Sequence, residues 1–360
     1  MSRSRTLAAI AAVTGLALLA GCNRQPPKFV PASTDSTAKA APDSFGVRVT
    51  RALERWESQP GDAAAAMTGA LIADDLGRHG DRPIAERART VLDSCGFSGE
   101  VSGAGPVAAI NLFARSDPSG GAWPSLFWRD GATVRVQPVD GSGMRLVDLA
   151  WRPAALDPAH AGADAGGQAA LLFTRNGPRG PQPVVLVWRR PTGAAAWTLV
   201  QTLGPDSLGG TGSARFVGSP DGAQIEAHTF RGAPGFDECA TCPHVMHTLR
   251  FAWATDGFAK RADVSVPSPY ATFVALIAAL KAGDHDLAAR RLADPTLLES
   301  ADRYQWGRGP GLWRVAPGTE EGANEMVFFH GAREAYRVRF SPRGTDWVVS
   351  DLQPVDRSIE

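Results

Sequence analysis

The chain opens with a short apolar run and continues into a segment with almost no large apolar side chains. Residues 7–20 are apolar apart from Thr14, and two arginines stand in front of them. This run is too short to cross a bilayer and is typical of a signal-peptide core. Residues 23–43 are rich in Pro, Ser, Thr and Ala, a composition that cannot bury enough surface to fold. We therefore predict a flexible tether over residues 22–44.

Between residues 45 and 98 the apolar positions repeat with the period of a helix. Phe45 begins the first apolar stripe, and breaks at residues 60–61 and at Pro83 divide the region into three helices. Cys95 falls on the apolar stripe of the third helix, so we expect a small buried thiol there and not a reactive one.

Between residues 107 and 266 the pattern changes to alternation, and Gly, Pro and Asp clusters separate short apolar runs. This pattern predicts an antiparallel all-β domain. One hairpin recurs: an apolar strand ends in Trp, and a tight polar loop and a second strand follow. Its markers, Trp128, Trp188 and Trp253, are 60 and 65 residues apart. That spacing is wider than the repeat of common propellers, so both a sandwich and an incomplete propeller fit.

Residues 267–360 combine both patterns. Ser268 and Pro269 predict the start of an apolar helix that Gly283 ends, and two shorter helices and four strands follow. The chain is thus expected to be a multi-domain, mainly β protein. It would comprise a helical region (45–98), an antiparallel β domain (107–266) and an α+β domain (267–360).

Net charge and chain length bear on the expected partners and on the number of domains. The 37 basic and 37 acidic side chains leave a formal net charge of zero over 360 residues. No overall field favours a polyanion, so we do not expect a nucleic-acid partner. The length predicts two or three domains.

The end of the first apolar run carries a specific motif. Residues 19–22 read Leu-Ala-Gly-Cys and resemble the lipobox of bacterial lipoproteins. In that family the cysteine is acylated and the signal is cut before it, which implies a signal peptide over 1–21 and a lipid anchor on Cys22. In the enterobacterial sorting pattern Asn23 implies the outer membrane. Because two or more acyl chains anchor stably, we expect an outer-membrane protein that faces the periplasm.

The C-terminal part has a weaker resemblance. Helices followed by a curved antiparallel sheet, with DWVVSDL at 346–352 as closing strand, are similar to nuclear-transport-factor-like domains. The resemblance implies a cone whose pocket is catalytic, ligand-binding or packed. A Gly-rich loop near the expected cone mouth is flanked by side chains that are favoured at binding hot spots. We take these as binding candidates, although rim packing would also explain them: Trp306, Arg308, Trp313 and Arg314.

The stretch DECATCPHVMH (237–247) concentrates reactive side chains. Covalent haem attachment needs C-x-x-C-H, and a proline interrupts that register here. Cys239, Cys242, His244 and His247 could ligate a metal, but strand alternation after the loop places the two histidines on opposite faces.

A redox pair and a structural disulfide are the other interpretations of the same loop. Thioredoxin-like sites need a βαβ setting that is not apparent around it. Beyond the inner membrane thiols are oxidised, so we predict a Cys239–Cys242 disulfide that holds a long hairpin loop. A bridge from Cys95 to either cysteine is the rival pairing.

No metalloprotease, serine-hydrolase or P-loop motif occurs in the sequence. The acidic cluster at 284–286 is interpreted as a helix start. Our leading hypothesis is a non-catalytic, lipid-anchored envelope protein without a cofactor that binds a partner protein or small ligand. The alternatives are an enzyme using a pocket in the C-terminal domain, and a metal-handling or redox lipoprotein centred on the CATC loop.

Overall fold

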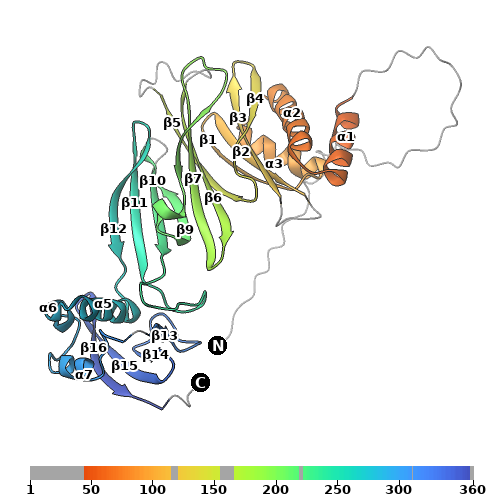
Figure 1. The fold of residues 1–360 in the computed structure, drawn as a ribbon. Coiled ribbons are helices and arrows are strands. Elements are labelled where there is room, and N and C mark those ends of the chain that lie inside the picture. The colour runs from red at the N-terminus through yellow and green to blue at the C-terminus, as the bar shows by residue number, and fades with distance from the viewer. Residues whose placement is uncertain (1–43, 115–120, 155–165, 219–221, 310, 357–360) are drawn as a thin grey trace, which may run out of the picture.

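The computed structural model describes residues 44–114, 121–154, 166–218, 222–309 and 311–356. The predicted signal peptide, Cys22 and almost all of the tether lie outside these residues. Within them, three helices precede twelve strands, and a second group of helices precedes four more strands (Figure 1). No helix in the described ranges is long and apolar enough to cross a membrane.

The N-terminal region forms the three helices that the apolar spacing predicts: α1 (Phe45–Ser58), α2 (Asp62–Arg78) and α3 (Ile84–Cys95). Ser44 caps α1 by accepting a hydrogen bond from the Val47 amide, and Gly96 ends α3 in the left-handed conformation that favours glycine. Cys95 is buried on α3, as predicted.

Twelve strands form three successive four-stranded antiparallel sheets, and each sheet keeps the chain order of its strands. The first sheet contains β1 (Gly99–Ala104), β2 (Val107–Phe113), β3 (Ala122–Asp130) and β4 (Thr133–Pro138). The second contains β5 (Arg145–Pro153), β6 (Gly167–Gly177), β7 (Gly180–Arg190) and β8 (Thr198–Leu203), and the four-residue helix α4 (Pro205–Leu208) follows it. The third contains β9 (Thr211–Val217), β10 (Gln224–Phe230), β11 (Met246–Ala254) and β12 (Gly257–Ser265). The sequence analysis did not predict β1.

The Trp-marked hairpins have a common place in this order. Trp128, Trp188 and Trp253 lie on β3, β7 and β11, which are the third strands of their sheets. Each hairpin is therefore the last pair of strands in one sheet. The spacings of 60 and 65 residues measure the step from one sheet to the next.

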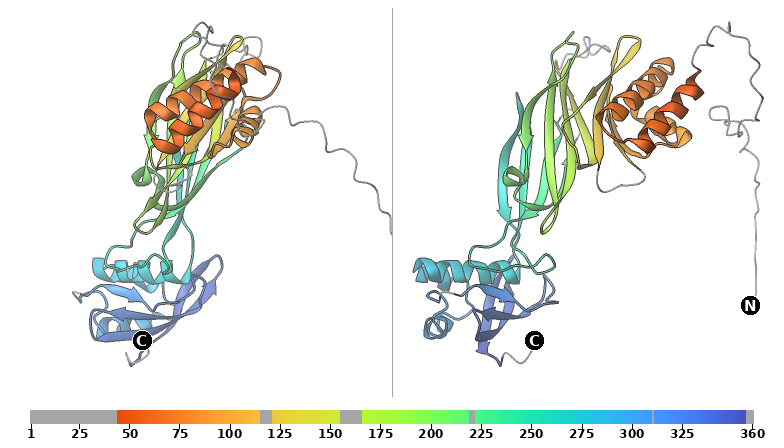
Figure 2. Two further views of the ribbon diagram at one scale, coloured as in Figure 1. Left: turned by 90° about the vertical axis from the view of Figure 1, so that its right-hand side faces the viewer. Right: turned by 45° about the vertical axis from the view of Figure 1, so that its right-hand side comes forward.

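The three sheets pack face to face, and the second sheet is buried on both sides (Figure 2). On β6, Ala169 and Leu171 pack toward the first sheet, whereas Ala170 and Leu172 pack toward the third. Successive residues of a strand point to opposite faces, so only a strand covered on both faces is apolar throughout. This explains why β6 and β7 lack the polar alternation of the outer sheets.

The two ends of the stack are closed differently. Helices α1–α3 share a hydrophobic core with the outer face of the first sheet. The outer face of the third sheet instead carries Glu226 between Arg215 and Arg250, at 2.7 and 3.3 Å. Three stacked four-stranded sheets resemble consecutive propeller blades more than a two-sheet sandwich. The predicted mainly β class is confirmed.

The C-terminal domain follows the predicted order of elements. It contains α5 (Pro269–Ala282), α6 (His285–Ala289), α7 (Leu297–Arg303), and a sheet of β13 (Trp313–Val315), β14 (Glu325–His330), β15 (Glu334–Arg343) and β16 (Asp346–Pro354). Aromatic rings fill the space between α5 and this sheet, and Phe273 stacks on Phe328 with centroids 3.8 Å apart. The inner face of the sheet is therefore packed where it meets α5.

The loop between β10 and β11 joins the stack to the C-terminal domain, and we call residues 231–245 the clasp (Figure 1). The amide of Trp313 donates to the Gly235 carbonyl at 3.0 Å, and the Asp237 amide donates to the Trp313 carbonyl at 2.8 Å. Phe236, between them, is buried in the core of the C-terminal domain. The clasp thus pairs with the edge of that domain's sheet through one parallel bridge, Phe236 to Trp313.

A buried carboxylate sits at the centre of this junction. Glu238 accepts a hydrogen bond from the Tyr270 hydroxyl at 2.8 Å and from the Ala233 amide at 3.3 Å, and His244 Nδ1 lies 3.4 Å from it. Burial, and then the adjacent Glu238 carboxylate, raise the pKa of Tyr270 well above its ordinary value. Tyr270 therefore stays protonated and donates to Glu238 under physiological conditions.

We predict that Phe236→Ala lowers the free energy of unfolding by roughly 3–5 kcal/mol, because it removes a buried ring and leaves a cavity at the junction. Limited proteolysis of the variant should cut first near residues 266–268, where the stack passes into α5. Val264→Ala, at a side chain that is 59% exposed on β12, should change stability by only about 0.5 kcal/mol or less. Equal effects of the two changes would contradict the account of the junction.

Candidate functional site

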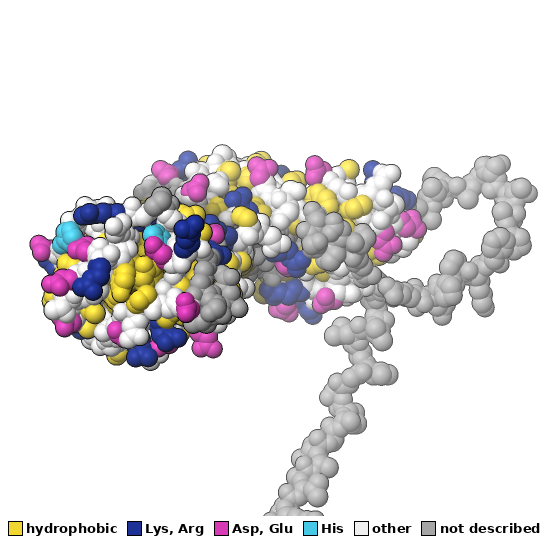
Figure 3. Space-filling view, turned by 60° about the horizontal axis from the view of Figure 1, so that its bottom comes forward, with side chains coloured by type: hydrophobic (Ala, Val, Ile, Leu, Met, Phe, Trp, Pro, Cys, Tyr) yellow, Lys and Arg dark blue, Asp and Glu magenta, His cyan; other side chains and the backbone are white. Residues whose placement is uncertain are grey.

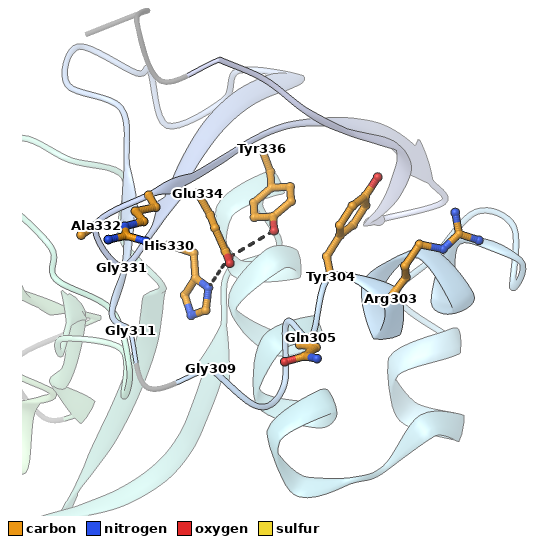
Figure 4. A pocket seen from close by; sticks show the side chains of 11 residues that line it. Arg303, Tyr304, Gln305, Gly309, Gly311, His330, Gly331, Ala332, Glu334 and Tyr336 are labelled. Atoms are coloured by element: carbon orange, nitrogen blue, oxygen red, sulfur yellow. Dashed lines mark hydrogen bonds and ion pairs between the residues drawn. The ribbon is translucent and has the colours of Figure 1, made fainter.

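The candidate site is an open cavity of about 670 Å³ at the edge of the C-terminal domain (Figure 4). Its walls come from the end of α7, from the Gly-rich loop after it, and from the β14–β15 hairpin. The side chains that define its chemistry are Arg303, Tyr304, His330, Arg333, Glu334 and Tyr336.

Three polar side chains meet at the hairpin. His330 Nδ1 lies 2.9 Å from Glu334 Oε2, and the Tyr336 hydroxyl donates to the same oxygen at 3.2 Å (Figure 4). The register of the hairpin places His330 directly opposite Glu334. Tyr336 is two residues further along β15, so its side chain leaves the same face of the strand as Glu334. The other carboxylate oxygen, Oε1, has no hydrogen bond within the described part of the chain.

The environment of His330 decides which of its ring nitrogens could act as a base. A carboxylate can only accept, so Nδ1 carries the proton toward Glu334, and in a neutral ring Nε2 is then the nitrogen with the lone pair. His330 is 6% exposed, and its Nε2 is buried with no hydrogen-bond partner among the described residues. A Cβ added to Gly309 would lie 3.0 Å from Nε2 and 2.3 Å from Cε1. The backbone of the Gly-rich loop therefore covers the edge of the ring.

The tryptophans named by the sequence analysis pack against the polar rings of this site. Trp306 and Trp313 are both 0% exposed. Trp313 stacks on His330 with centroids 4.4 Å apart and 19° between planes, and Trp306 meets Tyr336 edge-on at 5.1 Å. These contacts hold the two polar rings in place, and they leave neither indole available at the surface.

The arginines named by the sequence analysis lie outside the pocket wall. Arg308 and Arg314 are exposed, and Arg314 lies 5.7 Å from the Phe329 ring. The binding role assigned to Trp306, Arg308, Trp313 and Arg314 stays a prediction. The structure brings the two tryptophans together under the pocket and does not bring the two arginines into it.

Two other arginines border the pocket. Arg303 is the last residue of α7, and Arg333 lies in the turn between β14 and β15. Neither side chain has a hydrogen bond or ion pair to another residue that the structure describes. Their guanidinium groups are consequently available to an anion that enters from solvent.

Backbone strain is located at the same pocket. Gln305, which follows Tyr304 in the pocket wall, has φ of 54°, and it is the one non-glycine residue with positive φ in the described ranges. For a residue with a Cβ this conformation is unfavourable, and such strain is found more often at functional sites than elsewhere. The strain at Gln305 therefore supports this cavity as the candidate site.

The cysteine loop forms the predicted disulfide and not a cluster of ligands. Cys239 and Cys242 are bonded, with their Cα atoms 5.1 Å apart. His244 stacks on Phe230 at 3.5 Å, whereas His247 pairs with Asp263 at 2.8 Å. Over the described ranges no group of three or more His, Cys, Asp and Glu side chains could hold a metal ion.

The sequence analysis missed His330, Glu334 and Tyr336. The signal was present in FFHGAREAY, where a histidine and a glutamate flank a glycine-containing turn between two apolar runs. Pairing those runs as a hairpin would have placed His330 opposite Glu334. A comparison with family models finds no match for this chain, and a comparison with curated protein sequences finds none either.

Tyr336 provides a test of the cluster. Burial, and then the Glu334 carboxylate, raise the pKa of Tyr336 from 10.0 to about 12. The pKa of Tyr336 is higher in the folded protein than in the unfolded chain. The contribution of the neutral Tyr336 to the free energy of unfolding is therefore complete below pH 10 and is lost as the pH rises through about 12. We predict that Glu334→Gln lowers this pKa without returning it to 10.0, since burial remains.

The measurement is the ultraviolet absorbance of tyrosinate against pH, with the Tyr336→Phe variant subtracted to isolate this residue. A Tyr336 component that titrates near 10 in the unmodified protein would contradict the geometry of the cluster.

Proposed function

We propose that this protein is a lipid-anchored cell-envelope protein whose C-terminal pocket binds a small organic anion without transforming it. The observation that carries the proposal is the open cavity of about 670 Å³ bordered by Arg303 and Arg333, neither of which is paired with a described residue. Open, largely pre-formed clefts with a few convergent polar groups are the usual sites for small ligands.

The charges of the pocket support an anion. Glu334 directs one oxygen to both His330 and Tyr336, so its carboxylate is already partly compensated inside the wall. The two guanidinium groups at the rim can each form paired hydrogen bonds with a carboxylate or phosphate. Glu334 Oε1 remains as an acceptor for a hydroxyl or amine elsewhere on the same ligand.

The position of His330 favours binding over catalysis. A general base must reach the proton that it removes, at about 2.6–3.2 Å. The basic nitrogen of a neutral His330 that donates from Nδ1 is Nε2, and Nε2 is buried against the backbone of Gly309. His330 therefore orients Glu334 in this arrangement, and a hydrolase or transferase that uses His330 as its base is the less supported alternative.

The envelope location rests on the lipobox at 19–22 and on the tether that follows it. The surface charges support a partner other than nucleic acid, because the formal net charge is zero and basic and acidic side chains are interspersed over the face of the molecule in Figure 3. We propose that the protein is held at the outer membrane and meets its ligand in the periplasm.

Binding should depend on both rim arginines. We predict that succinate binds to the purified protein, and that the double variant Arg303→Gln/Arg333→Gln binds it at least about tenfold more weakly, because each lost charged hydrogen bond contributes roughly 1.5–3 kcal/mol. Isothermal titration calorimetry measures this directly. Arg261→Gln, an exposed arginine on β12, is the matched control and should leave the affinity unchanged. The same measurement with inorganic phosphate separates a carboxylate site from a phosphate site.

Anchoring has a separate test. Cys22→Ser removes the sulfur that would be acylated, so we predict that the protein leaves the membrane fraction or accumulates as uncleaved precursor. Cell fractionation and intact-mass measurement report both outcomes. Membrane association that is unchanged in this variant would reject lipidation at Cys22.

A further inference from the structure

The clasp and the pocket share one residue, Trp313. The clasp holds the Trp313 backbone from both sides, through the Gly235 carbonyl at 3.0 Å and the Asp237 amide at 2.8 Å. The indole of the same residue forms the surface on which His330 stacks. A segment that belongs to the third sheet of the stack thus determines the position of the pocket wall in another domain.

We propose that the Cys239–Cys242 disulfide regulates this pocket, so that its reduction by a dithiol loosens the clasp and lowers ligand affinity. The proposal rests on the proposed function for the identity of the site. It goes beyond that function because it assigns a redox control to a loop outside the pocket.

The disulfide is placed where it restrains the clasp. It closes a ring with a sequence separation of 3 immediately after Glu238, and Cys242 packs against the core of the C-terminal domain. Glu238 is buried and accepts a hydrogen bond from Tyr270. The ring limits the conformations that residues 239–242 can adopt, and opening the bond removes that limit.

The sulfurs can be reached by a reductant, because Cys239 is exposed and Cys242 is partly exposed. A thiolate of the dithiol attacks one sulfur, forms a mixed disulfide and releases the other cysteine as a thiol. The second thiol of the reductant then attacks the reductant sulfur of the mixed disulfide and releases the remaining cysteine as a thiol. Two electrons and two protons thus pass to the protein, and the dithiol becomes a cyclic disulfide. In an oxidising compartment the bonded form is the resting state.

Trp313 is the positioning residue that links reduction of the Cys239–Cys242 bond to the change in ligand affinity. When the clasp is restrained, the Trp313 backbone is fixed by residues 235–237 and its ring fixes His330. His330 in turn holds Glu334 at 2.9 Å. When the clasp is released, Trp313 keeps only its contacts within the C-terminal domain, and His330 and Glu334 lose a fixed orientation toward a ligand.

The test uses the full purified lipoprotein in its bonded form, after reduction with dithiothreitol, and as the double variant Cys239→Ser/Cys242→Ser. Succinate affinity is measured by calorimetry. The ring signals of His330 are measured by NMR without ligand and assigned by their loss in His330→Gln. Dithiothreitol added to the double variant is the matched control, because no clasp disulfide is left to reduce. Far-UV circular dichroism verifies that each form stays folded.

We expect reduction and the double variant to shift the His330 signals and to weaken succinate binding at least about fivefold, the lower end of typical couplings between two sites. A reduced, folded protein with unchanged His330 signals and affinity would overturn the proposal. Shifted His330 signals with unchanged affinity would overturn the regulation alone. Shifted signals in a protein that binds succinate in neither form would support the coupling and reject the proposed ligand.

Discussion

The two-sided hydrogen bonding between the clasp and Trp313 is the constraint on which the rest of this structure depends. It bridges a loop of the third sheet to the edge of the C-terminal sheet, and it buries Phe236 in the core of that domain and Glu238 beside Tyr270. A buried carboxylate is tolerated only when its hydrogen bonds are satisfied, and Tyr270 together with the Ala233 amide satisfies Glu238. The junction is therefore held by defined hydrogen bonds to a buried carboxylate as well as by apolar packing.

Much of the fold was predictable because local signals agreed with the final packing. Ser268 caps α5 and Gly283 ends it, as their residue types indicate. The Trp-marked hairpins were also recognised. Their assembly into three stacked sheets was not predicted, because the burial of both faces of β6 depends on its two neighbouring sheets and not on its own alternation.

The candidate site was predictable only in part. Trp306 and Trp313 drew attention to the region of the cavity, but residue type alone could not distinguish a ring that supports a pocket from one that lines it. Glu334 and His330 become neighbours only after the register of β14 and β15 is known. The disulfide was predictable from the spacing of its cysteines and from the expected compartment, whereas the burial of Glu238 required knowledge of what the clasp packs against.

Hydrogen exchange at the amides of Asp237 and Trp313 tests the central claim most directly. Both amides donate across the junction, so they should exchange slowly and only when the junction opens, while exposed clasp residues such as Ala240 exchange quickly. Protection of the Asp237 and Trp313 amides that is similar to that of the strand amides is the expected result. Exchange of these two amides at the rate of an exposed loop would contradict the account, because the clasp would then not hold the C-terminal domain.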